Sequence, residues 1–78
     1  MTMEQIDFFL MTVRCDTFLE AAENLHIAQS TLSKQIQKLE SELNLTLFDR
    51  TRRQAVLTPA GKLFCQEASE LSRQYHQM

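Results

Sequence analysis

The polar side chains between positions 29 and 38 are the ones whose types and spacing best suit chemistry. This polar cluster consists of Gln29, Ser30, Thr31, Ser33, Lys34 and Lys38. Glutamine can make two hydrogen bonds to an adenine, lysine can reach a guanine or a phosphate, and hydroxyl groups suit either partner. Lys38 lies one helical turn beyond Lys34, where a phosphate contact is the better interpretation. The cluster is therefore suited to hydrogen bonding with base edges and to ion pairing with phosphates.

A second basic segment, residues 50–54, contains three arginines. Arg52 and Arg53 are suited to the minor groove of a duplex or to its phosphate backbone. Two interpretations stay open for Arg50, a DNA contact or a structural ion pair with Glu40 or Asp49. For the lysines of the polar cluster, the alternative to a DNA contact is that they lie on a solvated helix face. That alternative is preferred wherever no motif supports a contact.

The net charge of −2 disfavours a nucleic-acid partner when it is taken alone, but the charges are unevenly distributed. Residues 1–27 hold five acids and one base, a net of −4, whereas residues 28–62 hold six bases and three acids, a net of +3. DNA responds to the local field of a binding face more than to the total charge. The distribution therefore permits DNA binding by the segment that carries both polar groups.

No residue pattern typical of an enzyme is present. The sequence lacks Ser/His/Asp, Cys/His and paired-carboxylate spacings, and its single glycine excludes a Gly-rich phosphate loop. Cys15 and Cys65 are fifty positions apart, which is neither a disulfide framework nor a metal knuckle, and His26 has no second ligand nearby. A chain of 78 residues is also too short to build a sheltered pocket of ordinary size. We expect no catalysis, no metal and no cofactor in this chain.

Two helices should precede the polar cluster. Thr2 with Gln5, and Thr17 with Glu20, have the spacing of a capping box, which marks the start of a helix. After each pair, apolar residues recur at i, i+3, i+4 and i+7, the pattern of one helix face. The second helix is only about two turns long, so tertiary packing must hold it. Thr17 starts this helix and is included among the predicted DNA-contacting residues.

The polar cluster itself belongs to a third predicted helix, over residues 29–43. Its apolar face consists of Leu32, Ile36, Leu39 and Leu43. Asn44 tolerates the left-handed conformation that often ends a helix. A short helix, a tight turn through residues 24–28 and a longer helix with a polar outer face make a helix-turn-helix. The second helix of such a motif fits the major groove of DNA.

Two short strands, residues 45–48 and 55–57, are predicted on either side of the basic segment, and together they predict a β-hairpin wing. Thr58 and Pro59 then suit the N-cap and the first position of a last helix. Its apolar residues form a heptad seam of Phe64, Ala68, Leu71, Tyr75 and Met78. The seam predicts a homodimer through this helix. The alternative is that the seam folds back onto the core of its own chain.

The predicted fold class is mainly α: a winged helix-turn-helix of three helices plus a short β-hairpin wing, followed by a long C-terminal linker helix. Residues 1–58 form the predicted DNA-binding domain, and residues 59–78 form the linker and dimerisation helix. The alternative function is a protein-interaction module, against which the polar face argues because docking surfaces favour aromatics and Met. No apolar run approaches a membrane span and the N-terminus lacks the basic region of a signal peptide, so we expect a cytoplasmic protein.

The stretch from Phe18 to Phe64 resembles the signature of LysR-type transcriptional regulators. The matching pieces are Ala21-Ala22, Leu25-His26-Ile27, Gln29-Ser30, Leu32-Ser33, Gln35-Ile36, Leu39-Glu40, Leu43, Leu47-Phe48, Arg50 and Leu57-Thr58-Pro59-Ala60-Gly61. The opening QIDFFLMTV is similar to the first helix of that family, so the resemblance covers nearly the whole chain. So many pieces in one order and spacing make it highly specific.

The resemblance implies a bacterial regulator that binds double-stranded DNA as a homodimer, with antiparallel linker helices and two recognition helices on a pseudo-palindromic site. Members also carry a larger C-terminal domain that binds a small co-inducer. This sequence lacks that domain, so we expect a fragment or an isolated module. Ala28, Ser30, Asn44 and Arg52 stand where many members have Ser, Pro, Gly and Gly. Ala28 therefore predicts a recognition helix without a good N-cap, and Arg52 adds a charge to a stiffer wing.

Overall fold

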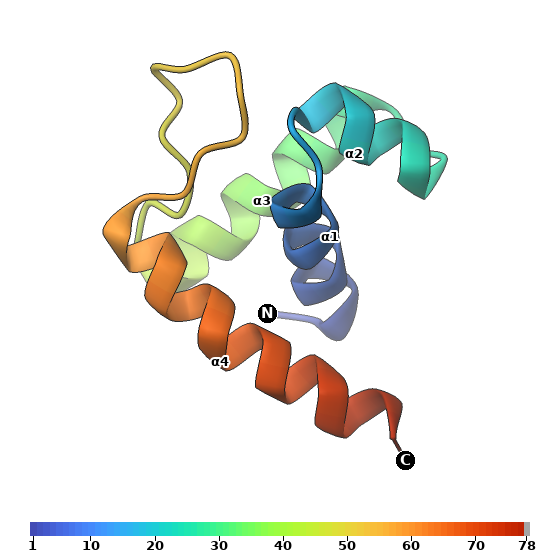
Figure 1. The fold of residues 1–78 in the computed structure, drawn as a ribbon, viewed down its shortest axis with the longest axis vertical. Helices are drawn as coiled ribbons and strands as arrows, with labels where there is room; N and C mark the ends of the chain where they lie inside the picture. The colour runs from blue at the N-terminus through green and yellow to red at the C-terminus, as the bar shows by residue number, and fades with distance from the viewer. Residues whose placement is uncertain (78) are drawn as a thin grey trace.

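Four α-helices make up the fold in the computed structural model, which describes residues 1–77. They are α1 (Met3–Arg14), α2 (Phe18–Leu25), α3 (Gln29–Leu43) and α4 (Pro59–His76). In Figure 1, α1 to α3 form one cluster, α4 runs along one side of it, and the segment between α3 and α4 projects beyond the helices. The mainly helical fold and the helix-turn-helix order are confirmed. Met78, the last residue of the predicted seam, lies outside the described residues.

Threonine side chains begin three of the four helices. The hydroxyls of Thr2, Thr17 and Thr58 each accept a hydrogen bond from the backbone N–H three residues further on, at 2.9–3.1 Å. The Gln5 side chain accepts from the Thr2 N–H in return, which completes the first capping box. Pro59 occupies the first turn of α4, where its missing N–H costs nothing. These predicted helix starts are confirmed.

Left-handed residues end α2 and α3. Asn44, with φ 56°, takes the conformation predicted for it. His26, with φ 59°, does the same at the end of α2, which its residue type did not lead us to expect. The N–H of the next residue, Ile27, donates to the Ala22 carbonyl at 3.0 Å, so a tight turn leads directly into α3. This turn fixes the angle between the two helices of the motif.

The core lies between α1, α2, α3 and the segment that follows α3. Phe9 is fully buried, and its ring lies 5.5 Å from the ring of Phe48 and 5.1 Å from that of Phe64. Each large apolar side chain buried in this way contributes about 1.5–3 kcal/mol. Ala21 and Ala22 are also buried, and as small residues they let α2 approach its neighbours closely. Of the helices in residues 1–77, only α1 packs against α4.

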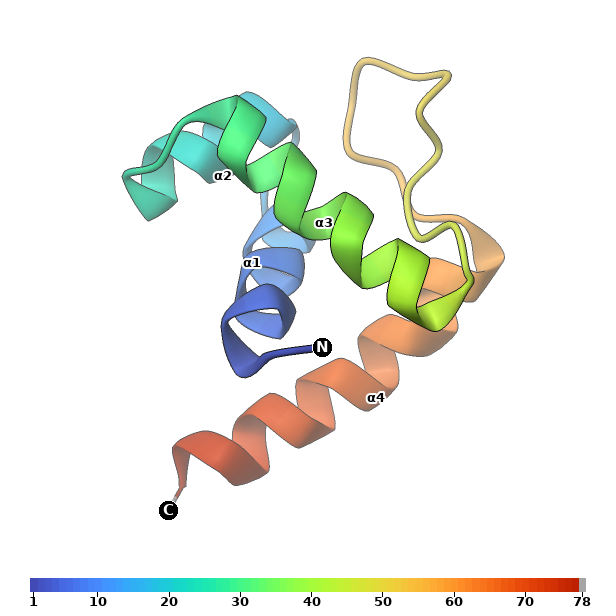
Figure 2. The same ribbon diagram turned by 180° about the vertical axis from the view of Figure 1, so that it is seen from behind.

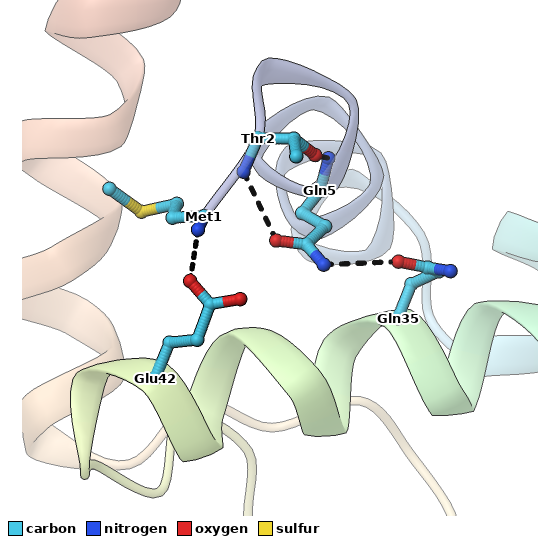
Figure 3. A network of polar contacts seen from close by, with 5 residues as sticks. All are labelled: Met1, Thr2, Gln5, Gln35 and Glu42. Carbon is cyan, nitrogen blue, oxygen red and sulfur yellow. Dashed lines mark hydrogen bonds and ion pairs between the residues drawn. The ribbon is translucent and has the colours of Figure 1, made fainter.

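Polar contacts join α1 to α3 on the side of the N-terminus, as Figure 3 shows. The Gln5 amide donates to the Gln35 side-chain carbonyl at 3.1 Å. The N-terminal amine of Met1 pairs with the Glu42 carboxylate. Both contacts hold α3 against the N-terminal segment, while the apolar face of α3 packs into the core.

A single β-bridge replaces the two strands that were predicted at residues 45–48 and 55–57. Phe48 and Leu57 face each other in an antiparallel pair, flanked by backbone hydrogen bonds of 2.8 and 2.9 Å, and no strand ladder forms within residues 1–77. The intervening chain, Asp49 to Val56, is a projecting loop in both views (Figures 1 and 2). We call residues 50–54 the basic loop. It is hairpin-like in path but not a β-hairpin.

The backbone N–H groups beside the bridge have partners elsewhere in the fold. The N–H groups of Leu47 and Phe48 donate to one oxygen of the Glu40 carboxylate, at 2.7 and 3.3 Å. On the returning side, the Ala55 N–H donates to the Asp16 carbonyl at 2.8 Å. Phe48 and Leu57 form a non-hydrogen-bonded pair, so of these three N–H groups only that of Leu47 would face the opposite segment in a continued ladder. The Glu40 carboxylate accepts that group, and the pairing does not continue past the single bridge.

Gly61 has a packing role that its place in the sequence motif did not indicate. It is buried in the first turns of α4, where the Leu47 carbonyl passes so close that a Cβ would overlap with it. Only glycine allows this approach of the two backbones. Gly61 therefore fixes the start of α4 against the segment that leads into the basic loop.

Candidate nucleic-acid interface

The helix α3 presents two chemically different faces. Leu32, Ile36 and Leu39 are fully buried. On the other side, all members of the polar cluster are exposed except Ser33, which is half-buried. Within residues 1–77, none of the six side chains makes an intramolecular hydrogen bond or ion pair. Their donors and acceptors are therefore free to meet another molecule.

The N-terminus of α3 lacks the side-chain cap that the other helices have. Ala28 has the extended backbone of an N-cap residue, φ −69° and ψ 145°, but no hydrogen-bonding side chain. This confirms the effect predicted from its departure from the family pattern. The first N–H groups of a helix have no partner inside it and carry partial positive charge. They add donors beside Gln29, Ser30 and Thr31, all of them exposed.

A groove of about 500 Å³ lies between the N-termini of α2 and α3 and the basic loop. Its lining includes six of the ten predicted DNA-contacting residues, Thr17, Gln29, Ser33, Arg50, Arg52 and Arg53. Phe18, Leu19, Asp49 and Gln54 complete the lining. The groove leaves out Ser30, Thr31, Lys34 and Lys38, which lie elsewhere on the exposed surface of α3. The folded chain thus brings both polar groups of the sequence onto neighbouring surfaces.

Arg50 contacts two side chains of its own chain. Its guanidinium donates to the Glu40 carboxylate at 2.8 Å and lies 5.0 Å from the centre of the Phe18 ring. Of the two interpretations left open by the sequence, the structural ion pair with Glu40 is therefore the one observed. The side chain is still 36% exposed, so this pairing leaves one edge of Arg50 in the groove.

The other two arginines of the basic loop differ from each other. Arg52 lies 3.5 Å from the Asp49 carboxylate. The hydroxyl and the N–H of Thr51 also donate to that carboxylate, and these bonds, with the nearby Arg52 charge, lower the pKa of Asp49. Arg53 makes no ion pair within residues 1–77. It is therefore the arginine of the loop with the freest charge.

The apolar residues of α4 are divided between the core and the surface. The ring of Phe64 is half-buried and packs edge-on against Phe9, and Ala68 is only 2% exposed. Leu71 and Tyr75 are 42% and 47% exposed. Leu63, which the predicted seam did not include, is 68% exposed. The first half of the seam thus packs on the core, and the second half leaves an apolar surface.

An apolar groove of about 640 Å³ runs beside this part of α4. Leu63 and Leu71 line it from α4, and Leu43, Leu45 and Met1 line it from the other side.

Among residues 1–77, no cluster of three or more potential metal ligands is found. None of the helices in this range has both the length and the apolar character needed to cross a bilayer.

Comparison with known proteins decides the family. The family model described as the bacterial regulatory helix-turn-helix protein, lysR family, matches residues 3–62. The chain belongs to the LysR family. Residues 1–77 therefore form a LysR-type helix-turn-helix DNA-binding domain, and the family is one of transcriptional regulators and not of enzymes. The family predicted from the sequence pieces is confirmed.

Two curated LysR-type relatives illustrate the similarity. The chain is 44% identical over 73 residues to an uncharacterised HTH-type transcriptional regulator of Bacillus subtilis, YcgK, covering 94% of this chain and 22% of that protein. It is 40% identical over 78 residues to a probable cat1 operon transcriptional activator of Acinetobacter lwoffii, covering 100% of this chain and 26% of that protein. The chain thus spans about a quarter of the length of the curated relatives it matches.

Solved LysR-type structures share the fold closely. The DNA-binding domain of BenM in complex with catB site 1 DNA is 40% identical, with a TM-score of 0.95, covering 100% of this chain and 84% of that one. The complex of the CbnR DNA-binding domain with DNA is 28% identical, with a TM-score of 0.93, covering 99% and 88%. Both similar proteins were therefore solved with DNA.

Proposed function

We propose that this chain reads the sequence of double-stranded DNA with the N-terminal half of α3 in the major groove. The observation that carries the proposal is the exposed, unpaired polar cluster on a helix whose opposite face is fully buried. An α-helix fits the major groove, and Gln29 and Lys34 offer the donors and acceptors that base edges require. Lys38 and the uncapped N-terminus of α3 then contact phosphates.

The basic loop contacts the neighbouring backbone or minor groove. Arg52 and Arg53 supply the charge, and the groove that joins the loop to Thr17 and Gln29 supports one continuous surface. Residues 28–62, which include α3 and the basic loop, carry a net charge of +3. This positive charge supports the proposal that α3 and the basic loop face the DNA. This mode of binding needs no metal or cofactor. Because the proposed partner is DNA, we expect the protein in the bacterial cytoplasm.

Residues 1–58 act as the reading unit and residues 59–78 as a linker helix that pairs with a second copy. The support is the exposed apolar surface of Leu63, Leu71 and Tyr75 beside the apolar groove. Two copies in a symmetric pair would read two half-sites. In analytical ultracentrifugation, the Leu71→Asp chain should show a smaller fraction of dimer than the natural chain. The Gln66→Asp chain should show the same fraction as the natural chain, because Gln66 is exposed and lies outside the groove. Equal association of all three would contradict pairing through this surface.

The test of DNA reading is a fluorescence-anisotropy titration against pooled promoter fragments at two salt concentrations, with excess random DNA as competitor. The proposal predicts retained binding to a subset of fragments that share a palindromic core, with two chains per site. Affinity should fall steeply with salt, because phosphate contacts release counterions. Binding that the competitor abolishes, or that never appears, would contradict sequence reading by this domain. The second of these results would favour a protein-interaction module.

A further inference from the structure

The Glu40 side chain joins the recognition helix to the segment that leads into the basic loop. It projects from α3 and is only 14% exposed. One carboxylate oxygen accepts the N–H groups of Leu47 and Phe48, at 2.7 and 3.3 Å, and the other accepts from the Arg50 guanidinium at 2.8 Å. Three donors therefore converge on one carboxylate. An ionised acceptor makes such bonds stronger than a neutral one would.

Arg50 extends this connection to α2. Its guanidinium lies 5.0 Å from the centre of the Phe18 ring, and Phe18 in turn packs edge-on against Phe48 at 5.1 Å. The returning side of the loop is held separately, by the Ala55 N–H on the Asp16 carbonyl. The basic loop is thus anchored at one end to α3 and at the other to the connection between α1 and α2. Between those ends, Arg53 has no partner within residues 1–77.

We propose that Glu40 and Arg50 are positioning residues that hold the basic loop at a fixed place relative to the reading face of α3. This inference rests on the proposed function, because the loop is taken to contact DNA together with α3. Arg50 then acts through Glu40 and Phe18 and not as a phosphate ligand. Holding the loop in advance removes part of the ordering cost that a mobile loop would add to binding.

Glu40 gives the proposal a test by sign. Replacing an acid near a DNA-binding face adds a positive increment of charge, which by itself strengthens binding. The proposal predicts the opposite for Glu40→Gln, a loss of about tenfold, because the loop is released. Glu42→Gln is the matched control. It makes the same charge change on the same helix, but Glu42 pairs with the Met1 amine and contacts no part of the loop. This control should leave affinity unchanged or slightly higher.

The Arg50→Met variant tests the same positioning role and keeps the fold. The Met side chain retains an apolar stem over Phe18, and Glu40 still accepts the two backbone N–H groups. Arg50→Met should weaken binding about as much as Glu40→Gln, and the double variant should lose no more than either single one. If Arg50 instead contacts a phosphate, Arg50→Met weakens binding while Glu40→Gln strengthens it by freeing Arg50. That pattern would overturn the proposal.

A measurement without DNA separates this proposal from the proposed function. Backbone ¹⁵N relaxation of the free protein should report rigid residues 51–54 in the natural chain and lower order parameters there in both Glu40→Gln and Arg50→Met. The residues of α3 should not change. Unchanged loop dynamics in both variants would overturn the positioning role, whatever the DNA data. Failure of the natural chain to bind any DNA would overturn the proposed function, and with it the role of the loop in binding.

Discussion

The recognition helix α3 and the basic loop carry the two polar groups of this LysR-type domain, but they are held by different forces. The polar face of α3 is fixed because the opposite face, Leu32, Ile36 and Leu39, is fully buried. The basic loop has no buried face of its own. It is held by hydrogen bonds to the Glu40 carboxylate and to one carbonyl of the α1–α2 connection. The apolar anchor is non-directional and large, whereas the polar anchor is directional and small.

The difference suggests a division of work. Base reading needs side chains held to within a fraction of an ångström, which a helix locked in the core provides. Phosphate contacts tolerate a less rigid support, because the charge of an arginine acts over several ångströms. In this account α3 carries the specificity and the basic loop carries affinity that is independent of sequence.

The largest expected effect comes from breaking the apolar anchor. Ile36→Ala should lower the free energy of unfolding by about 2–5 kcal/mol, because it leaves a cavity in the core. Chemical denaturation measures this. The exposed neighbour Gln37 is the control, and Gln37→Ala should stay within about 0.5 kcal/mol. A small loss for Ile36→Ala would show that α3 is not held mainly by its buried face.

Changes to the reading face should affect specificity without affecting the fold. Lys34→Ala should cost about 1–3 kcal/mol of binding on a specific site and less on random DNA, as expected for a base contact. Lys38→Ala, one turn further on, should weaken both kinds of DNA equally. Competition titrations on the two DNAs measure the ratio. Equal weakening by Lys34→Ala would make Lys34 a phosphate contact.

The helices of this domain could be predicted from the sequence, but some of their contacts could not. Periodicity and capping residues predicted all four helices, because burial of one face and N-caps are local in sequence. The polar cluster followed from the same pattern, since the buried side of α3 determines which side is left exposed. The left-handed His26 was missed because Gly and Asn, and not His, are the residues that usually end a helix in this conformation. The close approach at Gly61 was missed because it depends on the Leu47 backbone, fourteen residues away in the sequence.

The basic loop was the less predictable region for the same reason. The residues at 45–48 and 55–57 predicted two strands, but the carboxylate of Glu40 accepts the Leu47 N–H that a continued ladder would use. The sequence indicated Glu40 only as one of two ion-pair partners for Arg50, and it did not indicate the two backbone N–H groups that Glu40 accepts. The sequence left two interpretations open for Arg50, and only the fold shows its 2.8 Å contact with Glu40. Tertiary polar contacts thus decided what local pattern could not.

A smaller effect should follow from giving α3 the polar cap that it lacks. Ala28 already has the extended backbone of an N-cap residue, so Ala28→Ser should raise the free energy of unfolding by about 1 kcal/mol. Thr17→Ala should lower it by about the same amount, because it removes the observed cap of α2. Thermal unfolding of the two variants checks both signs. No gain from Ala28→Ser would mean that the first turn of α3 is already satisfied.

The smallest effect is expected from one charge of the basic loop. Arg53→Ala should weaken binding to all DNA sequences alike and reduce the slope of log affinity against log salt by about 0.9. Titrations at several salt concentrations measure the slope. Arg73→Ala serves as the control, because Arg73 lies on α4 and pairs with Glu70. A loss confined to one DNA sequence would give the loop a base-reading role.

The most direct test of the account is an NMR titration of the ¹⁵N-labelled chain with a specific site and, separately, with random DNA of the same length. We expect the amides of Gln29 to Lys34 to shift differently on the two DNAs, while those of residues 50–54 shift alike on both. Shifts that discriminate in the basic loop but not in α3 would contradict the assignment of specificity to the recognition helix.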